Sequence, residues 1–175
     1  MDDGSRRSCE AEPSMMHKGR ILYWDSDVFL SYVGAHPDRI NTITSLLQEI
    51  QNDGDAIVVT SVIAQVEVAY AAHEKTQRAL DPQTEEAIDA LWEDSSIVEL
   101  IDLSYHIALM ARSLIRQAMV NGWALRANDA IHLASAQWLP GVREFHTYDT
   151  RLKRFGSLIH CDVCEPHVLQ PRLLP

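Results

Sequence analysis

The sequence lacks the features that would mark a secreted or membrane protein. Its 175 residues include three cysteines, Cys9, Cys161 and Cys164. An odd number of thiols cannot form a complete disulfide framework, and so few agree with a reducing compartment. No apolar run approaches the roughly 18 residues that a membrane span needs, and the N-terminal segment lacks the apolar centre of a signal peptide. We therefore expect a cytoplasmic protein.

The chain also lacks an excess of positive charge. It has 15 lysines and arginines against 25 aspartates and glutamates, a formal net charge of -10. This balance argues against a protein that holds nucleic acid by positive charge alone. It leaves nucleic acid open as a partner, because a site that gathers acids around divalent cations is negative until the bound metal attracts phosphate.

The composition is otherwise that of a single globular domain. Hydrophobic residues make up 46% of the chain and charged residues 23%, and no internal repeat or low-complexity segment is visible. Residues 1–18 are polar, mixed in charge and aperiodic, which predicts a disordered N-terminal lead. We expect one domain over residues 19–170 and a short tail at 171–175.

Short β-branched runs alternate with longer helical patterns. Strands are predicted at residues 21–24, 56–60, 97–101 and 144–148, with a further extended piece at 158–163. Helices are predicted at residues 27–34, 38–51, 61–79, 82–93, 107–118 and 129–138. Strands separated by helices pair in parallel. The pattern therefore predicts an α/β fold, a three-layer α/β/α sandwich with a central, mainly parallel sheet.

Four acidic residues stand where such a sheet would bring them together. Asp25 and Asp149 follow the first and fourth predicted strands, and Asp129 opens a helix behind a predicted N-cap, Asn128. Glu67 lies in the helix after the second strand, beside the apolar residues of "TSVIAQVEVAY". Because ligands bind beyond the carboxyl ends of parallel strands, we expect these acids to converge on one rim.

Gathered carboxylates repel one another unless a cation compensates their charge. Oxygen ligands with room for water suit Mg²⁺ or Mn²⁺. Two such ions can hold the attacking water and the leaving oxygen of a phosphodiester. The cluster therefore predicts metal-dependent hydrolysis of a phosphate ester.

At these motifs the sequence resembles the PIN-domain ribonucleases and, among them, the VapC-type toxins of toxin–antitoxin pairs. The resemblance spans roughly residues 20–165 and rests on "DSDVF", "TSVIAQVEV", "NDAIHLASA" and "TYD". It implies a PIN-like fold and an endoribonuclease whose Mg²⁺ or Mn²⁺ is held by Asp25, Glu67, Asp129 and Asp149. It also implies a homodimer and an inhibitory antitoxin partner that covers the acidic site.

Several residues near these acids could support the metal ligands or contact the substrate. The resemblance implies that the hydroxyls of Ser26 and Thr147 support the metal ligands without touching the metal. Asp27 departs from the family pattern, which has Asn, Ser or Thr at this position. For Asp27, helix capping or support of the ligands is favoured over direct ligation. Possible contacts to substrate phosphates are Arg126, Arg151, Lys153 and Arg154. A solvated charged face is an equal alternative for these cations.

Two other functions compete with the nuclease. A non-catalytic PIN-like module would bind RNA or protein at the rim, but such a module usually loses an acid and none is missing here. The "DSD" after a strand is also typical of haloacid-dehalogenase-like phosphatases, in which the first aspartate is the nucleophile. Phe29 and the absence of a downstream lysine with paired acids make that phosphatase a remote alternative.

Two histidine-containing stretches favour structural roles. "HCDVCEPH" at residues 160–167 offers two cysteines and two histidines, yet ligands so crowded rarely close a zinc tetrahedron alone, and the sequence shows no second cluster. Surface or packing roles are therefore favoured. His132 shares a helical face with Asp129, and a hydrogen-bonded core histidine is favoured there over a catalytic one.

Overall fold

The computed structural model describes residues 19–53 and 56–168, which form an α/β sandwich around a five-stranded sheet. All neighbouring strands pair in parallel, in the order β3-β2-β1-β4-β5. The strands are β1 (Arg20–Trp24), β2 (Ala56–Ser61), β3 (Val98–Ile101), β4 (Val142–His146) and β5 (Asp162–Cys164). The predicted fold class is confirmed. The lead and the tail expected at residues 1–18 and 171–175 lie outside the described residues.

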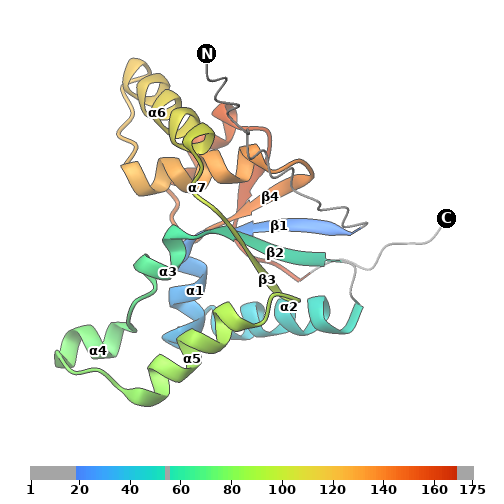
Figure 1. Cartoon of the computed structure of the whole chain (residues 1–175), viewed down its shortest axis with the longest axis vertical. Coiled ribbons are helices and arrows are strands. Elements are labelled where there is room, and N and C mark those ends of the chain that lie inside the picture. The colour runs from blue at the N-terminus through green and yellow to red at the C-terminus, as the bar shows by residue number, and fades with distance from the viewer. Residues whose placement is uncertain (1–18, 54–55, 169–175) are drawn as a thin grey trace, which may run out of the picture.

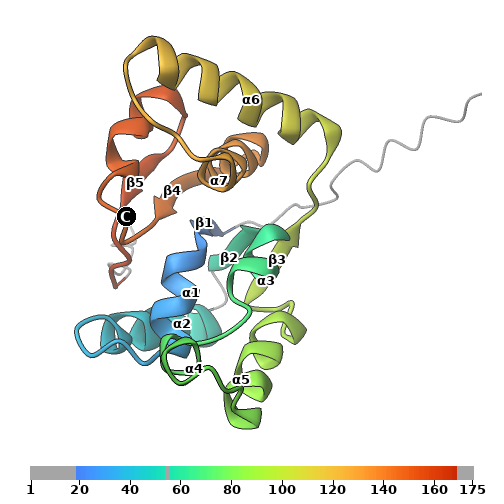
Figure 2. The same cartoon turned by 90° about the vertical axis from the view of Figure 1, so that its left-hand side faces the viewer.

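Helices cover both faces of the sheet, which gives the three layers visible in Figure 1 and Figure 2. On one face lie α1 (Ser26–Val33), α2 (Ile40–Asp53) and α5 (Pro82–Glu93). On the other lie α6 (Tyr105–Val120), α7 (Ala127–Trp138) and the 3₁₀ helix η1 (Leu152–Leu158). Between β2 and α5 run the short helices α3 (Ile63–Glu67) and α4 (Ala72–Gln77). None of the helices in the described ranges is long and apolar enough to cross a membrane.

The central strand β1 divides the interior into two cores. Leu22 and Trp24 pack with α1 and α2, whereas Ile21 and Tyr23 pack with α6 and α7. A strand covered on both faces needs apolar side chains in both directions. This requirement explains the uninterrupted run "ILYW" in place of an alternating pattern.

The parallel pairing brings three strand ends to one edge of the sheet. Asp25 follows β1, α3 follows β2, and the turn of residues 147–149 follows β4. The Asp25 amide donates to the carbonyl of His146 at 3.1 Å, which fixes the end of β1 beside the end of β4. We call this edge the acidic rim, after Asp25, Glu67, Asp129 and Asp149.

One predicted helix is two helices. The pattern over residues 61–79 predicted a single helix, but α3 ends at Glu67 and α4 begins at Ala72. The buried side chain of Val68 joins the core beside β1, and its backbone leaves helical geometry at φ -95, ψ 45. A carboxylate oxygen of Glu74 accepts the amide of Ala71 at 2.7 Å and starts the second helix. Tertiary packing here overrides local helical spacing.

The same segment differs from prediction in two further ways. Its first helix begins at Ile63 and not at residue 61, because Thr60 and Ser61 lie buried inside β2. Val66 and Tyr70, two of the apolar residues near Glu67, are 78% and 43% exposed. Apolar spacing alone therefore did not identify the buried side of this helix.

Two boundaries near the rim also differ from prediction. α7 begins at Ala127, so Asn128 is inside the helix and is not its cap. β4 covers residues 142–146 and not 144–148, because Thr147 and Tyr148 turn away to contact Asp27. Both shifts result from side-chain contacts between elements distant in sequence.

Candidate functional site

Asp25 begins the rim at the junction of β1 and α1. Its Oδ1 accepts the amide of Asp27 at 2.8 Å and caps α1, and the residue is only 6% exposed. Burial raises the pKa of Asp25 well above its usual range, and the nearby carboxylate of Asp27 raises it further, against a hydrogen bond from Thr147. A neutral asparagine or serine would cap as well. Capping alone therefore does not explain a buried acid at this position.

Glu67 ends α3 with both carboxylate oxygens in use. Oε2 accepts hydrogen bonds from the Ser26 hydroxyl and from His132 Nε2, the latter at 2.8 Å. Oε1 accepts one from the amide of Asn128 at 2.8 Å. Burial raises the pKa of this carboxyl, but the three donors outweigh burial and lower the pKa to about 2. Glu67 is therefore ionised at neutral pH and fixed in orientation.

A buried chain of hydrogen bonds sets the tautomer of His132. The Tyr23 hydroxyl accepts the amide of Ser61 at 3.1 Å and lies 2.8 Å from His132 Nδ1. A carboxylate only accepts, so Nε2 carries the proton that is donated to Glu67; in the neutral ring, Nδ1 then accepts from Tyr23. His132 is buried and hydrogen-bonded, as expected from sequence. Its link to Glu67, and that of Asn128, could not be read from spacing.

Asp129 and Asp149 complete the rim and interact electrostatically. Burial raises the pKa of Asp129, and repulsion from Asp149 and Glu67 adds to this shift. Arg126 and Arg151 act in the opposite direction on Asp129. Asp149 forms an ion pair with Arg151, whose hydrogen bonds lower the pKa of Asp149. Asp129 is thus close enough to both Asp149 and Glu67 to be influenced by their charges.

Asp27 holds the turn that carries Asp149. Its carboxylate accepts the amide of Tyr148 at 3.1 Å and the hydroxyl of Thr147 at 3.3 Å. The same hydroxyl oxygen of Thr147 accepts the amide of Asp149 at 2.9 Å. Asp25 caps α1, so the capping role considered for Asp27 is wrong. Asp27 instead connects α1 to the end of β4.

We expect Asp27→Ala to lower the free energy of unfolding by about 1–2 kcal/mol, because it leaves the Tyr148 amide without its acceptor. The rate of any hydrolysis carried out at the rim should fall about 10-fold as the turn of Asp149 loosens. Thermal melts and initial rates check both effects. Asp81→Ala is the matched control: it removes the cap of α5, costs about 1 kcal/mol and should leave the rate unchanged. Equal rates for the two variants would remove Asp27 from the site.

The predicted phosphate-contacting cations divide into two groups. Arg126 precedes α7, and Arg151 pairs with Asp149, so both lie at the rim. Lys153 pairs with Glu165 at 3.1 Å, and Arg154 is exposed. The sequence did not single out Arg39, whose guanidinium carbon lies 4.1 Å from the centre of the Tyr148 ring.

The rim fits a hard divalent cation by its donor set. A bound cation would compensate the charge of Glu67 and would favour the ionised form of buried Asp25. It would also offset the repulsion between Asp129 and its neighbouring acids. Within residues 19–53 and 56–168 the acids do not form a group whose ligand atoms all lie within 4.8 Å of one another. As placed, no three of these acids can therefore coordinate one ion directly, and an ion held by all four would bind some of them through water, as Mg²⁺ commonly does.

Comparison with known proteins assigns the family. A family model of the PIN domain matches residues 22–158. The chain belongs to the PIN domain family. Among curated protein sequences, none matches this chain significantly.

Solved structures share the fold at low sequence identity. VapBC2 from Rickettsia felis, bound to a DNA fragment from its promoter, superposes with a TM-score of 0.59 at 15% identity, covering 82% of this chain and 96% of that one. VapBC-1 from nontypeable Haemophilus influenzae superposes with a TM-score of 0.59 at 16% identity, covering 83% of this chain and 97% of that one. Mycobacterium tuberculosis VapC20, described as a sarcin-ricin loop cleaving toxin, superposes with a TM-score of 0.57 at 14% identity, covering 77% of this chain and 95% of that one. These likenesses establish the fold.

Proposed function

We propose that this protein is a metal-dependent endoribonuclease that acts as the toxin of a toxin–antitoxin pair. The observation that carries the proposal is Glu67, kept ionised by three hydrogen-bond donors and electrostatically coupled to Asp129 at the carboxyl end of the sheet. A structural carboxylate is often matched by a lysine or arginine, whereas Glu67 is held by Ser26, His132 and Asn128 and lies near a further acid, Asp129. Such an arrangement suits a bound cation.

The four acids share one task in the proposed mechanism. Asp25, Glu67, Asp129 and Asp149 would hold Mg²⁺ or Mn²⁺, which when bound supplies an acidified water and positive charge for the phosphate. Ser26 and His132 orient Glu67, and Thr147 orients the Asp149 turn. Arg126, which lowers the pKa of Asp129, and Arg151, which pairs with Asp149, would each contact a substrate phosphate.

The partners we propose are RNA, a cognate antitoxin and a second copy of the chain, in the cytoplasm. Two of the solved neighbours are VapBC complexes, which supports an antitoxin. Val66 and Tyr70 are exposed on either side of Glu67. Apolar side chains beside an acidic rim suit a partner segment that covers the rim while it presents cations to the acids.

Removal of divalent metal tests the proposal. We expect EDTA to abolish RNA cleavage and Mn²⁺ or Mg²⁺ to restore it, because carboxylates alone do not produce the nucleophile. Initial rates on a labelled single-stranded RNA measure both steps. Asp25→Asn protein purified in the same way controls for contaminating ribonucleases. Cleavage that persists in excess chelator contradicts the metal mechanism, and binding of RNA without cleavage under all metal conditions favours the binding-module alternative.

A further inference from the structure

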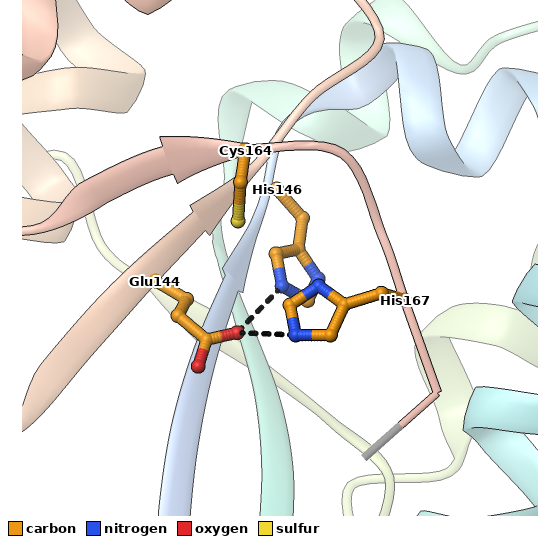
Figure 3. Close-up of side chains that lie close together, drawn as sticks. All are labelled: Glu144, His146, Cys164 and His167. Atoms are coloured by element: carbon orange, nitrogen blue, oxygen red, sulfur yellow. Dashed lines mark hydrogen bonds and ion pairs between the residues drawn. The ribbon is translucent and has the colours of Figure 1, made fainter. Parts of the chain in front are cut away.

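A second group of potential metal ligands lies where β4, β5 and the following segment meet, and it is separate from the four acids of the rim. Glu144 and His146 come from β4, Cys164 ends β5, and His167 follows it. One ligand atom from each of the four lies within 4.8 Å of the others. Figure 3 shows these side chains pointing toward one another.

One distance within this group suits a tetrahedral ion. Glu144 Oε2 lies 3.6 Å from His167 Nε2, and only 3.0 Å, a hydrogen-bond distance, from His146 Nε2. Bonds of about 2.0–2.3 Å in a tetrahedral zinc site place neighbouring ligand atoms roughly 3.3–3.7 Å apart. Arg20 occupies the other oxygen of Glu144, Oε1, at 3.1 Å and leaves Oε2 for the group.

In its neutral form, His167 has the tautomer that a metal ligand requires. Its Nδ1 lies 3.2 Å from the backbone carbonyl of Glu165, which can only accept, so Nδ1 carries a proton. In the neutral ring, Nε2 then presents a lone pair to Glu144 Oε2, another acceptor. A cation between these two atoms turns the unfavourable pair into two coordination bonds. Donation of the other ring N–H to a backbone carbonyl is the usual support of a coordinating histidine.

His146 has the opposite tautomer. Trp24 Nε1, which can only donate, lies 3.1 Å from His146 Nδ1, so Nδ1 is the acceptor and Nε2 carries the proton in the neutral ring. That proton is donated to Glu144 Oε2. The ring is fully buried and packed, so exchanging the tautomer would leave the indole N–H of Trp24 without a partner. His146 therefore orients Glu144 and does not coordinate.

We propose that Glu144, Cys164 and His167 bind a borderline-soft divalent cation of the Zn²⁺ class, with His146 as a positioning residue behind Glu144. Thiolate, imidazole and carboxylate together select Zn²⁺ over Mg²⁺. Binding releases the thiol proton of Cys164 to solvent. Three protein ligands leave a fourth position for water or a partner's side chain.

The fold supplies what the sequence could not show. Within "HCDVCEPH", Cys161 is buried in the core beneath α6 and α7, and His160 is exposed. The remaining Cys164 and His167 meet Glu144 only because β4 and β5 are adjacent. Bound metal would tie residues 165–168 to the sheet and so stabilise the edge strand β5.

Cobalt spectroscopy tests this site without any measurement of RNA cleavage. Co²⁺ is titrated into metal-free Cys9→Ser protein in saturating Mg²⁺, which occupies the acidic rim. We expect a thiolate-to-cobalt charge-transfer absorption that saturates at one equivalent and disappears when Zn²⁺ is added. Cys164→Ser should abolish this absorption, whereas Cys161→Ala should retain it. The absorption requires a sulfur ligand, so failure here is distinguishable from failure of the proposed nuclease.

Two histidine variants test the assignment of roles. His167→Gln should weaken Co²⁺ binding at least about 100-fold, whereas His146→Gln should keep the absorption and weaken binding about 10-fold. Absence of the absorption in the wild type, or its survival in Cys164→Ser, overturns the site. Its loss in folded His146→Gln overturns the three-ligand assignment. Zn²⁺ should also raise the melting temperature of the wild type but not of Cys164→Ser.

Discussion

Asp25→Asn is expected to lower the rate of RNA cleavage by about 10³-fold while making the metal-free protein more stable. The rate falls because a ligand charge that contributes several kcal/mol to the proposed metal site is lost. Stability rises because the pKa of Asp25 is raised by burial and by Asp27, so its ionised form is disfavoured in the folded state. Asparagine keeps the capping oxygen that accepts the Asp27 amide.

The sign of the stability change is checked by pH. A raised pKa removes stability as pH increases from the unfolded value toward the folded one. In EDTA the variant should therefore melt higher than the wild type at pH 7, and the difference should shrink below about pH 4, where Asp25 is protonated in both states. Saturating Mn²⁺ should stabilise only the wild type. A variant that melts lower in EDTA would mean that Asp25 is a stabilising structural acid.

Glu67→Gln is expected to lose activity to a similar extent, about 10³-fold, but with the opposite effect on stability. The pKa of Glu67 is lowered to about 2, so the ionised carboxylate stabilises the fold above its unfolded pKa of about 4.5. That contribution disappears as pH falls toward 2. Glutamine keeps the side-chain size, but its NH₂ group replaces one of the two accepting oxygens. This NH₂ group then faces a hydrogen-bond donor, because Ser26, His132 and Asn128 all donate to the carboxylate.

Loss of the Glu67 charge should lower the free energy of unfolding by an amount of order 1–3 kcal/mol at pH 7. Urea unfolding at pH 7 and pH 3 measures it, and the difference between wild type and variant should be smaller at the lower pH. Gln65→Glu, on an exposed position of the same helix, is a control that should change neither rate nor stability appreciably. A Glu67→Gln protein that cleaves RNA at the wild-type rate would show that Glu67 is a structural element of the Tyr23–His132 chain.

Much of the fold is determined by local sequence. The strand predicted at residues 21–24 is found at Arg20–Trp24, and the helix predicted at residues 82–93 is found at Pro82–Glu93, where Asp81 caps it. The Asn-Gly pair at 121–122 ends α6, with Gly122 at φ +70. These features depend on neighbouring residues, so spacing and capping chemistry suffice to locate them.

The errors in the predicted helix and strand boundaries lie where contacts between residues distant in sequence set the structure. The break between α3 and α4 depends on Val68 entering the core, and the early end of β4 depends on Asp27, more than a hundred residues away in the chain. Neither contact leaves a periodic pattern in the sequence. Strand-end position alone could place the four acids on a common edge, but it could not show which donors hold each one.

The sequence by itself determined the class of fold and the acids that belong to its rim, because parallel strands interrupted by helices send their carboxyl ends to one edge. Tertiary structure alone decided the chemical state of those acids. Asp25 is forced toward neutrality by burial, and Glu67 is held ionised by Ser26, Asn128 and His132. It also decided that Cys164 and His167 face Glu144. Both outcomes depend on the distances between side chains and on their desolvation, which no local pattern encodes.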